Sequence, residues 1–261
     1  MRRVILGFDG HRASRSALAW VVHRAAQAHE PLRATIVPMG GDEPGRADLE
    51  AAVDALRAVG VASRISTGEQ QNDLVRPPET DDMVVLGVPA RPHPHPPTDD
   101  AVRRIMRYAP APSCFIPAGW VPGAGPVTVG VDADDSSDIA VYFAAREAAQ
   151  TGRMLRLVHS LTPAGARSPA GGGAPGAHRS SRARLDAAVR EARLAAEGIP
   201  IEVDLRRTEP TAALSSAAAD SSMIVIGTHR RGFLDSGPFG SVGQHLIGRV
   251  TCPVCVVPPA Q

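Results

Sequence analysis

The sequence contains no lysine. All 28 basic side chains are arginine, which excludes a P-loop lysine, a kinase strand lysine and a Schiff-base lysine. Three cysteines, an odd number, do not make a disulfide framework and fit a reducing compartment. No apolar run reaches the length of a membrane span, and Met1 leads directly into the apolar residues 4–8. We therefore expect no transmembrane helix, no signal peptide and a cytoplasmic location.

The net charge is also small, and familiar catalytic motifs are missing. A net charge of +1 predicts no strong electrostatic attraction to nucleic acid or to an anionic membrane. The sequence has no Gly-x-Ser-x-Gly elbow, no His-Glu-x-x-His helix and no Ser-Gly-Gly-x-Asp-Ser loop. These are the motifs of common hydrolases, metalloproteases and pyrophosphatases. We therefore assign no catalytic residue.

The two halves of the chain repeat each other, and this repeat predicts its domains. The matching segments are 4–9 with 127–132, 82–87 with 222–227, and 112–117 with 253–258. A chain of 261 residues with 43% hydrophobic content can supply two cores. We predict one domain over residues 1–117, a linker over 118–125 and a second domain over 126–261.

Short apolar runs alternate with segments of helical period in each half, which indicates a parallel sheet with crossover helices. Strands are predicted at 3–8, 32–37, 61–65, 83–87 and 113–117, and at 126–131, 154–159, 201–206, 223–227 and 253–257. Helices are predicted at 14–29, 47–59, 70–76 and 99–108, and at 136–151, 179–197, 210–219 and 240–249. The Gly-, Pro- and Ala-rich residues 162–177 are predicted to form a mobile loop. The expected fold is α/β, with two tandem doubly wound domains of five parallel strands each.

The carboxyl ends of two strands in the second half form a candidate ligand site. Asp132 follows the first of these strands and Gly227 ends the fourth. If the two strands are neighbours, both residues face the crevice where doubly wound sheets bind ligands. Gly240 and Ser241 begin a predicted helix, where backbone N–H groups and a hydroxyl suit a phosphate. In the alternative interpretation, Asp132 only caps a helix and the loop is only a connection.

These residues resemble a tandem universal stress protein, a family with an adenine-nucleotide α-hydrolase-like fold. Its ATP-binding members carry Gly, two residues, Gly, nine residues, then Gly-Ser or Gly-Thr, and Gly227 and Gly240-Ser241 match that spacing. The resemblance implies the following site: Val131 and Asp132 beside base and ribose, Gly227, Thr228 and His229 near ribose and phosphate, Arg230 in the same turn, and Gly240, Ser241 and Val242 around the phosphates.

Arg230 departs from this motif, because it stands where the family has its second glycine. Its Cβ resists the close backbone approach that glycine allows. The guanidinium could donate to a phosphate, or the side chain could fill the site. Gly232, two residues on, could serve a shifted turn. We expect ATP binding in the second domain, weakened by Arg230; the alternative is a nucleotide-free scaffold or dimerisation protein whose site Arg230 closes.

The first half departs further from the motif. Asp9 and Gly87 remain, but Ala90 and Asp100 stand at the later glycine positions. Asp99 and Asp100 place two negative charges where a phosphate would sit. The first domain is therefore interpreted as a degenerate copy.

The remaining histidines, cysteines and arginines that could bind a ligand or react are interpreted as structural residues. His93 and His95 have no further metal ligands placed near them by sequence, so no metal site is assigned. Cys252 and Cys255 are interpreted as packing residues rather than a redox pair. The arginine-rich segment 179–193 is interpreted as a solvated helix face.

The resemblance also implies the mode of action. We expect a stress-response protein that binds adenine nucleotide and acts through an unknown protein partner. Its halves are expected to form an intramolecular pseudo-dimer about a pseudo-two-fold axis, through final strands near Cys114 and Cys255, with a homodimer left open. We expect no enzyme, leaving open slow ATP hydrolysis supported by His229.

Overall fold

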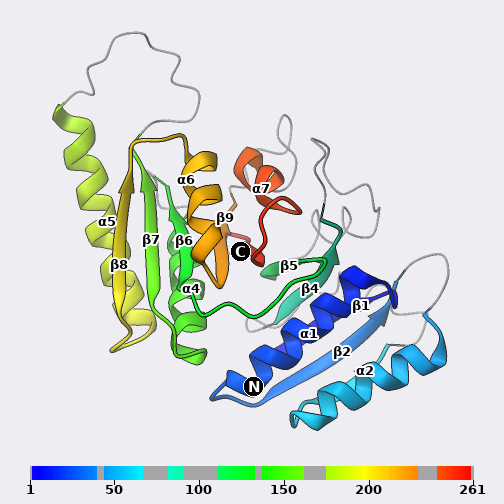
Figure 1. Cartoon of the computed structure of the whole chain (residues 1–261). Helices are drawn as coiled ribbons and strands as arrows, with labels where there is room; N and C mark the ends of the chain where they lie inside the picture. The colour runs from blue at the N-terminus through cyan, green and yellow to red at the C-terminus, as the bar shows by residue number, and fades with distance from the viewer. Residues whose placement is uncertain are drawn as a thin grey trace. The chain divides into compact units, whose positions relative to one another are not determined.

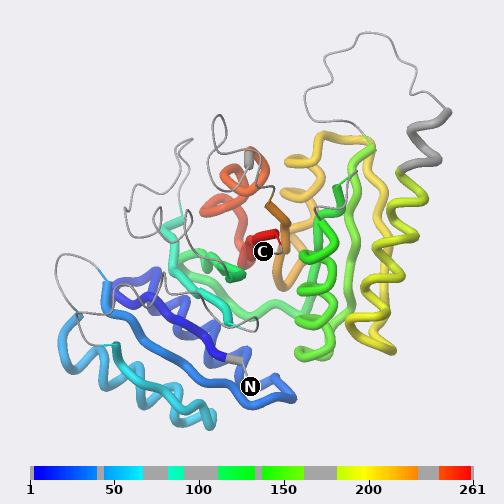
Figure 2. The backbone as a smooth tube through the Cα atoms, turned by 180° about the vertical axis from the view of Figure 1, so that it is seen from behind, coloured from blue at the N-terminus to red at the C-terminus, as the bar shows by residue number. Residues whose placement is uncertain are grey.

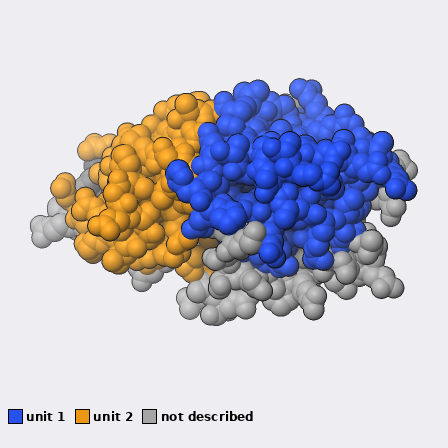
Figure 3. Space-filling view, turned by 90° about the horizontal axis from the view of Figure 1, so that it is seen from below, with its two compact units in different colours: residues 1–122, 247–256 blue, residues 123–246, 257–261 orange. Residues whose placement is uncertain are grey.

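The computed structural model describes residues 2–39, 44–66, 82–90, 111–132, 137–161, 175–228 and 240–259. The chain is built of alternating strands and helices (Figure 1, Figure 2). It divides into two compact units, one of residues 1–122 with 247–256 and one of residues 123–246 with 257–261 (Figure 3). The boundary at residue 122 falls inside the segment predicted as a linker, 118–125.

The first unit contains five parallel strands in the order β3-β2-β1-β4-β5. They are β1 (Arg2–Phe8), β2 (Leu32–Pro38), β3 (Ala62–Ile65), β4 (Met83–Val88) and β5 (Ser113–Pro117). The helices described in this unit are α1 (Arg12–Gln27) and α2 (Arg46–Ala58). Val4, Ile5 and Leu6 are all buried. Because successive strand residues point to opposite faces, this continuous burial shows that both faces of the sheet are covered.

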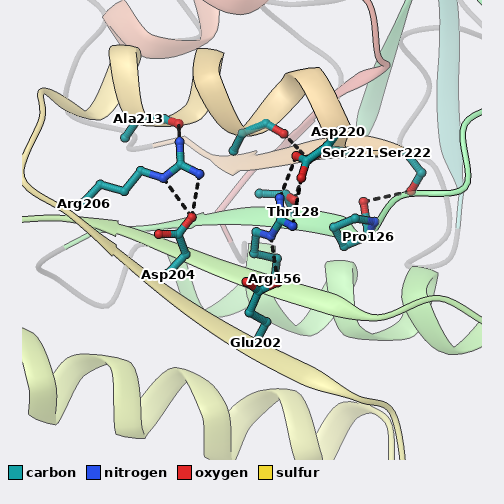
Figure 4. A network of polar contacts seen from close by, with 11 residues as sticks. Pro126, Thr128, Arg156, Glu202, Asp204, Arg206, Ala213, Asp220, Ser221 and Ser222 are labelled. Atoms are coloured by element: carbon teal, nitrogen blue, oxygen red, sulfur yellow. Dashed lines mark hydrogen bonds and ion pairs between the residues drawn. The ribbon is translucent and has the colours of Figure 1, made fainter.

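The second unit repeats this plan, with parallel strands in the order β9-β6-β7-β8. Its strands are β6 (Val127–Val131), β7 (Leu155–Ser160), β8 (Ile201–Arg206) and β9 (Met223–Gly227). Its helices are α4 (Asp138–Gln150), α5 (Pro175–Ala195), α6 (Pro210–Ala217), the short 3-10 helix η3 (Ala218–Asp220) and α7 (Gly240–Leu246). Helices α4 and α5 pack against each other below the sheet in Figure 4, and α6 lies above it.

The last strand, β10 (Val254–Val257), pairs antiparallel with β5. Cys255 lies opposite Cys114, and both side chains are fully buried. The pairing of the final strands near these cysteines, which the family resemblance implied, is confirmed. Cys114, Cys252 and Cys255 are buried free thiols.

The α/β class predicted from the repeat is confirmed, and every predicted strand is present with bounds within one residue of the prediction. The helices predicted at 70–76 and 99–108, and most of the predicted loop 162–177, lie outside the described residues. The end of that loop prediction is wrong, because α5 already begins at Pro175; proline is well tolerated in the first turn of a helix. Helix α7 ends at Leu246, short of the predicted 249, and Gly248 follows with a left-handed φ of 77°. Among the helices that the structure describes, none has the length and apolarity to cross a membrane.

Candidate functional site

Strands β6 and β9 are direct neighbours, which brings two predicted site residues to one edge of the sheet. They run parallel, with Val129 opposite Val225. Their carboxyl ends therefore lie together. Val131, the last residue of β6, is buried, and Asp132 follows it with an exposed side chain. Gly227, the last residue of β9, is partly exposed. The site predicted from the sequence required these two strands to be neighbours, and they are.

The remaining predicted residues follow β9. Thr228 donates its backbone N–H to the Val257 carbonyl at 3.0 Å, so this amide is already used within the chain. Gly240 is the first residue of α7, where Ser241 is exposed and Val242 is partly buried. His229 and Arg230 lie outside the described residues.

Arg184 of α5 binds the loop that follows β6, a role that the sequence did not reveal. Its side chain is 9% exposed. The guanidinium donates through Nε to the Asp132 carbonyl at 3.3 Å and through Nη2 to the Ser137 hydroxyl at 3.0 Å and the Asp138 carboxylate at 2.5 Å. The interpretation of segment 179–193 as a solvated face is therefore wrong at Arg184, because this residue lies on the side of α5 that packs on α4. It remains appropriate for the exposed Arg182 and Arg190.

His159 fixes the end of β6 from the neighbouring strand β7. Its ring is buried, and Nδ1 lies 2.8 Å from the Val131 carbonyl oxygen. A carbonyl only accepts hydrogen bonds, so Nδ1 carries the hydrogen in this contact. The Val131 carbonyl is thus fixed by a side chain of the neighbouring strand β7. The sequence placed His159 at the end of a predicted strand but carried no signal of this contact.

The first unit repeats one contact of this segment. The Asp9 amide donates to Ser14 Oγ at 3.3 Å, as the Asp132 amide donates to Ser137 Oγ at 3.3 Å. In the first unit, the Ser14 hydroxyl also donates to Asp9 Oδ1 at 2.6 Å, and the His11 amide donates to the same oxygen at 2.9 Å. The Asp9 carboxylate is therefore engaged by its own loop.

A close backbone contact accompanies this loop at the end of β4. A Cβ added to Gly87 would lie 2.1 Å from the carbonyl carbon of Ala13 in the first turn of α1. Only glycine allows such an approach. Ala90 is exposed, whereas Asp99 and Asp100 lie outside the described residues. The degenerate character of the first nucleotide loop stays a prediction.

An ion-pair network lies near the starts of strands β7 and β8, away from their carboxyl ends (Figure 4). Arg156, near the start of β7, donates through Nε to Glu202 of β8 at 3.0 Å and through Nη1 and Nη2 to both carboxylate oxygens of Asp220 at 2.8 and 3.1 Å. The hydrogen bond to Asp220 raises the pKa of Arg156 and lowers that of the Asp220 carboxyl. These residues join three elements far from the carboxyl ends, which indicates a structural role.

Metal ligation finds no support in the described part of the chain, where no three His, Cys, Asp or Glu side chains gather as a metal site requires. His93 and His95 lie outside the described residues. The chemistry available at the carboxyl edge of the second sheet is hydrogen bonding, supplied by the Asp132 carboxylate, the Ser241 hydroxyl and backbone groups.

Comparisons with known proteins identify the family of the chain. The family model described as the universal stress protein family matches residues 124–258. A universal stress protein of Mycobacterium tuberculosis is 30% identical over 138 residues, covering 51% of this chain and 48% of the relative. The chain thus spans about half the length of the curated relatives it matches.

Two solved structures from Archaeoglobus fulgidus are also similar. The crystal structure of a universal stress protein from strain DSM 4304 has a TM-score of 0.67 and 14% identity, covering 99% of this chain and 98% of that chain. This likeness shows the fold. A universal stress protein from Archaeoglobus fulgidus solved in complex with dAMP is 28% identical, covers 52% of this chain and 98% of its own, and has a TM-score of 0.39. Since the family model matches more than half of the 261 residues, the chain belongs to the universal stress protein family.

Proposed function

We propose that the second unit binds an adenine nucleotide, with ATP the expected ligand, at the carboxyl ends of β6 and β9. The observation that carries this proposal is the pairing of these strands, which brings Asp132 and Gly227 to one edge. Membership of a family with ATP-binding members supports the same ligand class. The spacing from Gly227 to Gly240-Ser241 supports ATP in particular.

Each residue of the proposed site has a defined task. Val131 and Asp132 contact the base and ribose, where a carboxylate accepts hydrogen bonds from ribose hydroxyls. The turn after Gly227 lies at the ribose and phosphate, and Ser241 donates its hydroxyl to a phosphate oxygen. His159 and Arg184 position Val131 and Asp132, since each donates a hydrogen bond to one of their backbone carbonyls.

Arg230 decides between this function and a nucleotide-free scaffold. The scaffold is favoured by one observation: the Thr228 amide, a donor in the proposed turn, already bonds to Val257. Isothermal titration of the purified chain with ATP, repeated for Arg230→Gly and Ser241→Ala, distinguishes the two functions. We expect wild-type binding that Arg230→Gly tightens about tenfold, equivalent to about 1.4 kcal/mol, and Ser241→Ala weakens. Undetectable binding by both the wild type and Arg230→Gly would refute the nucleotide site, whereas binding by Arg230→Gly alone would establish a site closed by Arg230.

The proposed protein acts in the stress response by presenting its nucleotide-bound form to a protein partner, without strong catalysis. Phosphate release from ATP that Ser241→Ala abolishes would contradict this part of the proposal. The cytoplasmic location stays a prediction.

A further inference from the structure

Strand β8 presents an open edge with hydrogen-bonding groups available for another strand. Among the described strands, only β7 pairs with it. The Pro200 and Arg206 carbonyls accept bonds from the Leu155 and Leu161 amides at 2.9 and 2.8 Å, so the even-numbered residues point their backbone groups toward β7. Alternate residues point to opposite sides in a parallel pair. The backbone N–H and C=O groups of Ile201, Val203 and Leu205 therefore point outward.

The same edge exposes apolar side chains. Val203 is 44% exposed and Leu205 is 47% exposed. They lie on one face of the strand, because side chains alternate between faces. Helix α5 packs on α4 and β7 and leaves these two side chains accessible. An edge with outward backbone groups and exposed β-branched or leucine side chains is a template for strand addition.

Charge selects the strand that fits this edge. In an antiparallel pair of two β8 strands, outward-pointing residues must face each other. A two-fold axis at Asp204 places Val203 opposite Leu205 and Glu202 opposite Arg206, each twice. An axis at Val203 instead places Glu202 opposite Asp204 twice, which is repulsive. An axis at Leu205 pairs only the last three strand residues. The register centred on Asp204 thus sets one like-charged pair, Asp204 with Asp204, against two attractive pairs and aligns more of β8 than the axis at Leu205 does.

The charges in that register are accommodated by existing contacts. The two Asp204 side chains meet at the axis, and each is held by its own Arg206 at 2.6 Å. Glu202 contacts Arg156 of the same chain at 3.0 Å. Each Glu202-Arg206 pair would thus extend an ion-pair network already present in the second unit (Figure 4).

We propose that two copies of this chain dimerise by antiparallel pairing of β8 about a two-fold axis at Asp204. The contact is isologous, as closed dimers require. It uses main-chain hydrogen bonds for affinity and the Val203-Leu205 and Glu202-Arg206 contacts for register.

A charge exchange tests both the dimer and its register by sedimentation velocity of the full chain. We expect a concentration-dependent dimer for the wild type. Glu202→Arg or Arg206→Glu alone turns two attractive contacts repulsive and should weaken dimerisation at least about tenfold. An equimolar mixture of the two variants restores both attractions and should restore the dimer. Mixing does not restore the ion pairs within each chain. Recovery of the dimer would therefore show that residues 202 and 206 meet across the interface.

A matched pair of valine variants locates the interface. Val203→Lys should abolish the dimer, because an edge lysine opposes strand addition. Val121→Lys makes the same change at a valine that is 73% exposed outside β8 and should leave the dimer intact. A wild type that sediments as a monomer at every concentration, a dimer unaffected by Val203→Lys, or a mixture that stays monomeric while the wild type dimerises would overturn the proposal.

Discussion

At the scale of single residues, Arg184 connects α5 to the loop that follows β6. Its guanidinium contacts Asp132, Ser137 and Asp138, residues about fifty positions earlier in the chain. The sequence predicted Asp132 because that residue follows an apolar run directly. It could not predict Arg184, because one arginine in a helix with several others carries no sign of the loop it meets in three dimensions.

Replacing this arginine should destabilise the second unit. Arg184→Met keeps much of the apolar stem but leaves the buried Ser137 hydroxyl and the Asp132 carbonyl without this donor. The expected loss in free energy of unfolding is about 1–3 kcal/mol. Urea unfolding of the variant measures it, and Arg182→Met, an exposed change in the same helix, should stay within about 0.5 kcal/mol of the wild type. Equal stability of both variants would show that the Arg184 contacts contribute nothing.

At the scale of elements, the sequence located strands better than it located helix ends. Buried parallel strands are short apolar runs between breakers, so β5, β8 and β9 have the bounds that their residues predict. Helix ends depend on local contacts, and α5 and α7 differ from their predicted bounds for this reason. Hydrophobic periodicity predicts that β6 and β9 are strands, but it does not predict that they are neighbours in the sheet.

The network joining β7, β8 and η3 predicts a pH dependence at this scale. The hydrogen bond from Arg156 lowers the pKa of Asp220 below its ordinary value of 3.8. A carboxyl with a lowered folded-state pKa stabilises the fold above its ordinary pKa, and this stabilisation disappears as pH falls through the lower value. Because the Asp220 side chain is 64% exposed, solvent screening limits the contribution to about 0.5 kcal/mol.

The test compares Asp220→Asn with the wild type by urea unfolding at neutral pH and in acid. The wild type should be the more stable at neutral pH, and the difference should shrink as pH falls below 3.8 and disappear below the lowered pKa of Asp220. Asp186→Asn, at an exposed aspartate of α5, is the matched control. A difference between wild type and Asp220→Asn that grows on acidification would contradict the assigned sign.

At the scale of the whole molecule, the internal repeat predicted two α/β halves before any pairing was known. The repeat also supplies a comparison within one chain. Gly227 and Gly240-Ser241 keep the spacing of the nucleotide loop in the second half, whereas Ala90 and Asp100 stand at the later glycine positions of the first half. Acidic side chains at the start of a helix repel a phosphate, so the first half is the poorer nucleotide site. We therefore predict nucleotide binding in the second unit alone.

Isothermal titration with ATP of the wild type, Asp132→Ala and Asp9→Ala tests whether the second unit alone binds nucleotide. The wild type should bind one nucleotide per chain, Asp132→Ala should lose at least about tenfold in affinity, and Asp9→Ala should match the wild type. Absence of binding, two nucleotides per chain, or a loss in Asp9→Ala with none in Asp132→Ala would rule out a nucleotide site confined to the second unit.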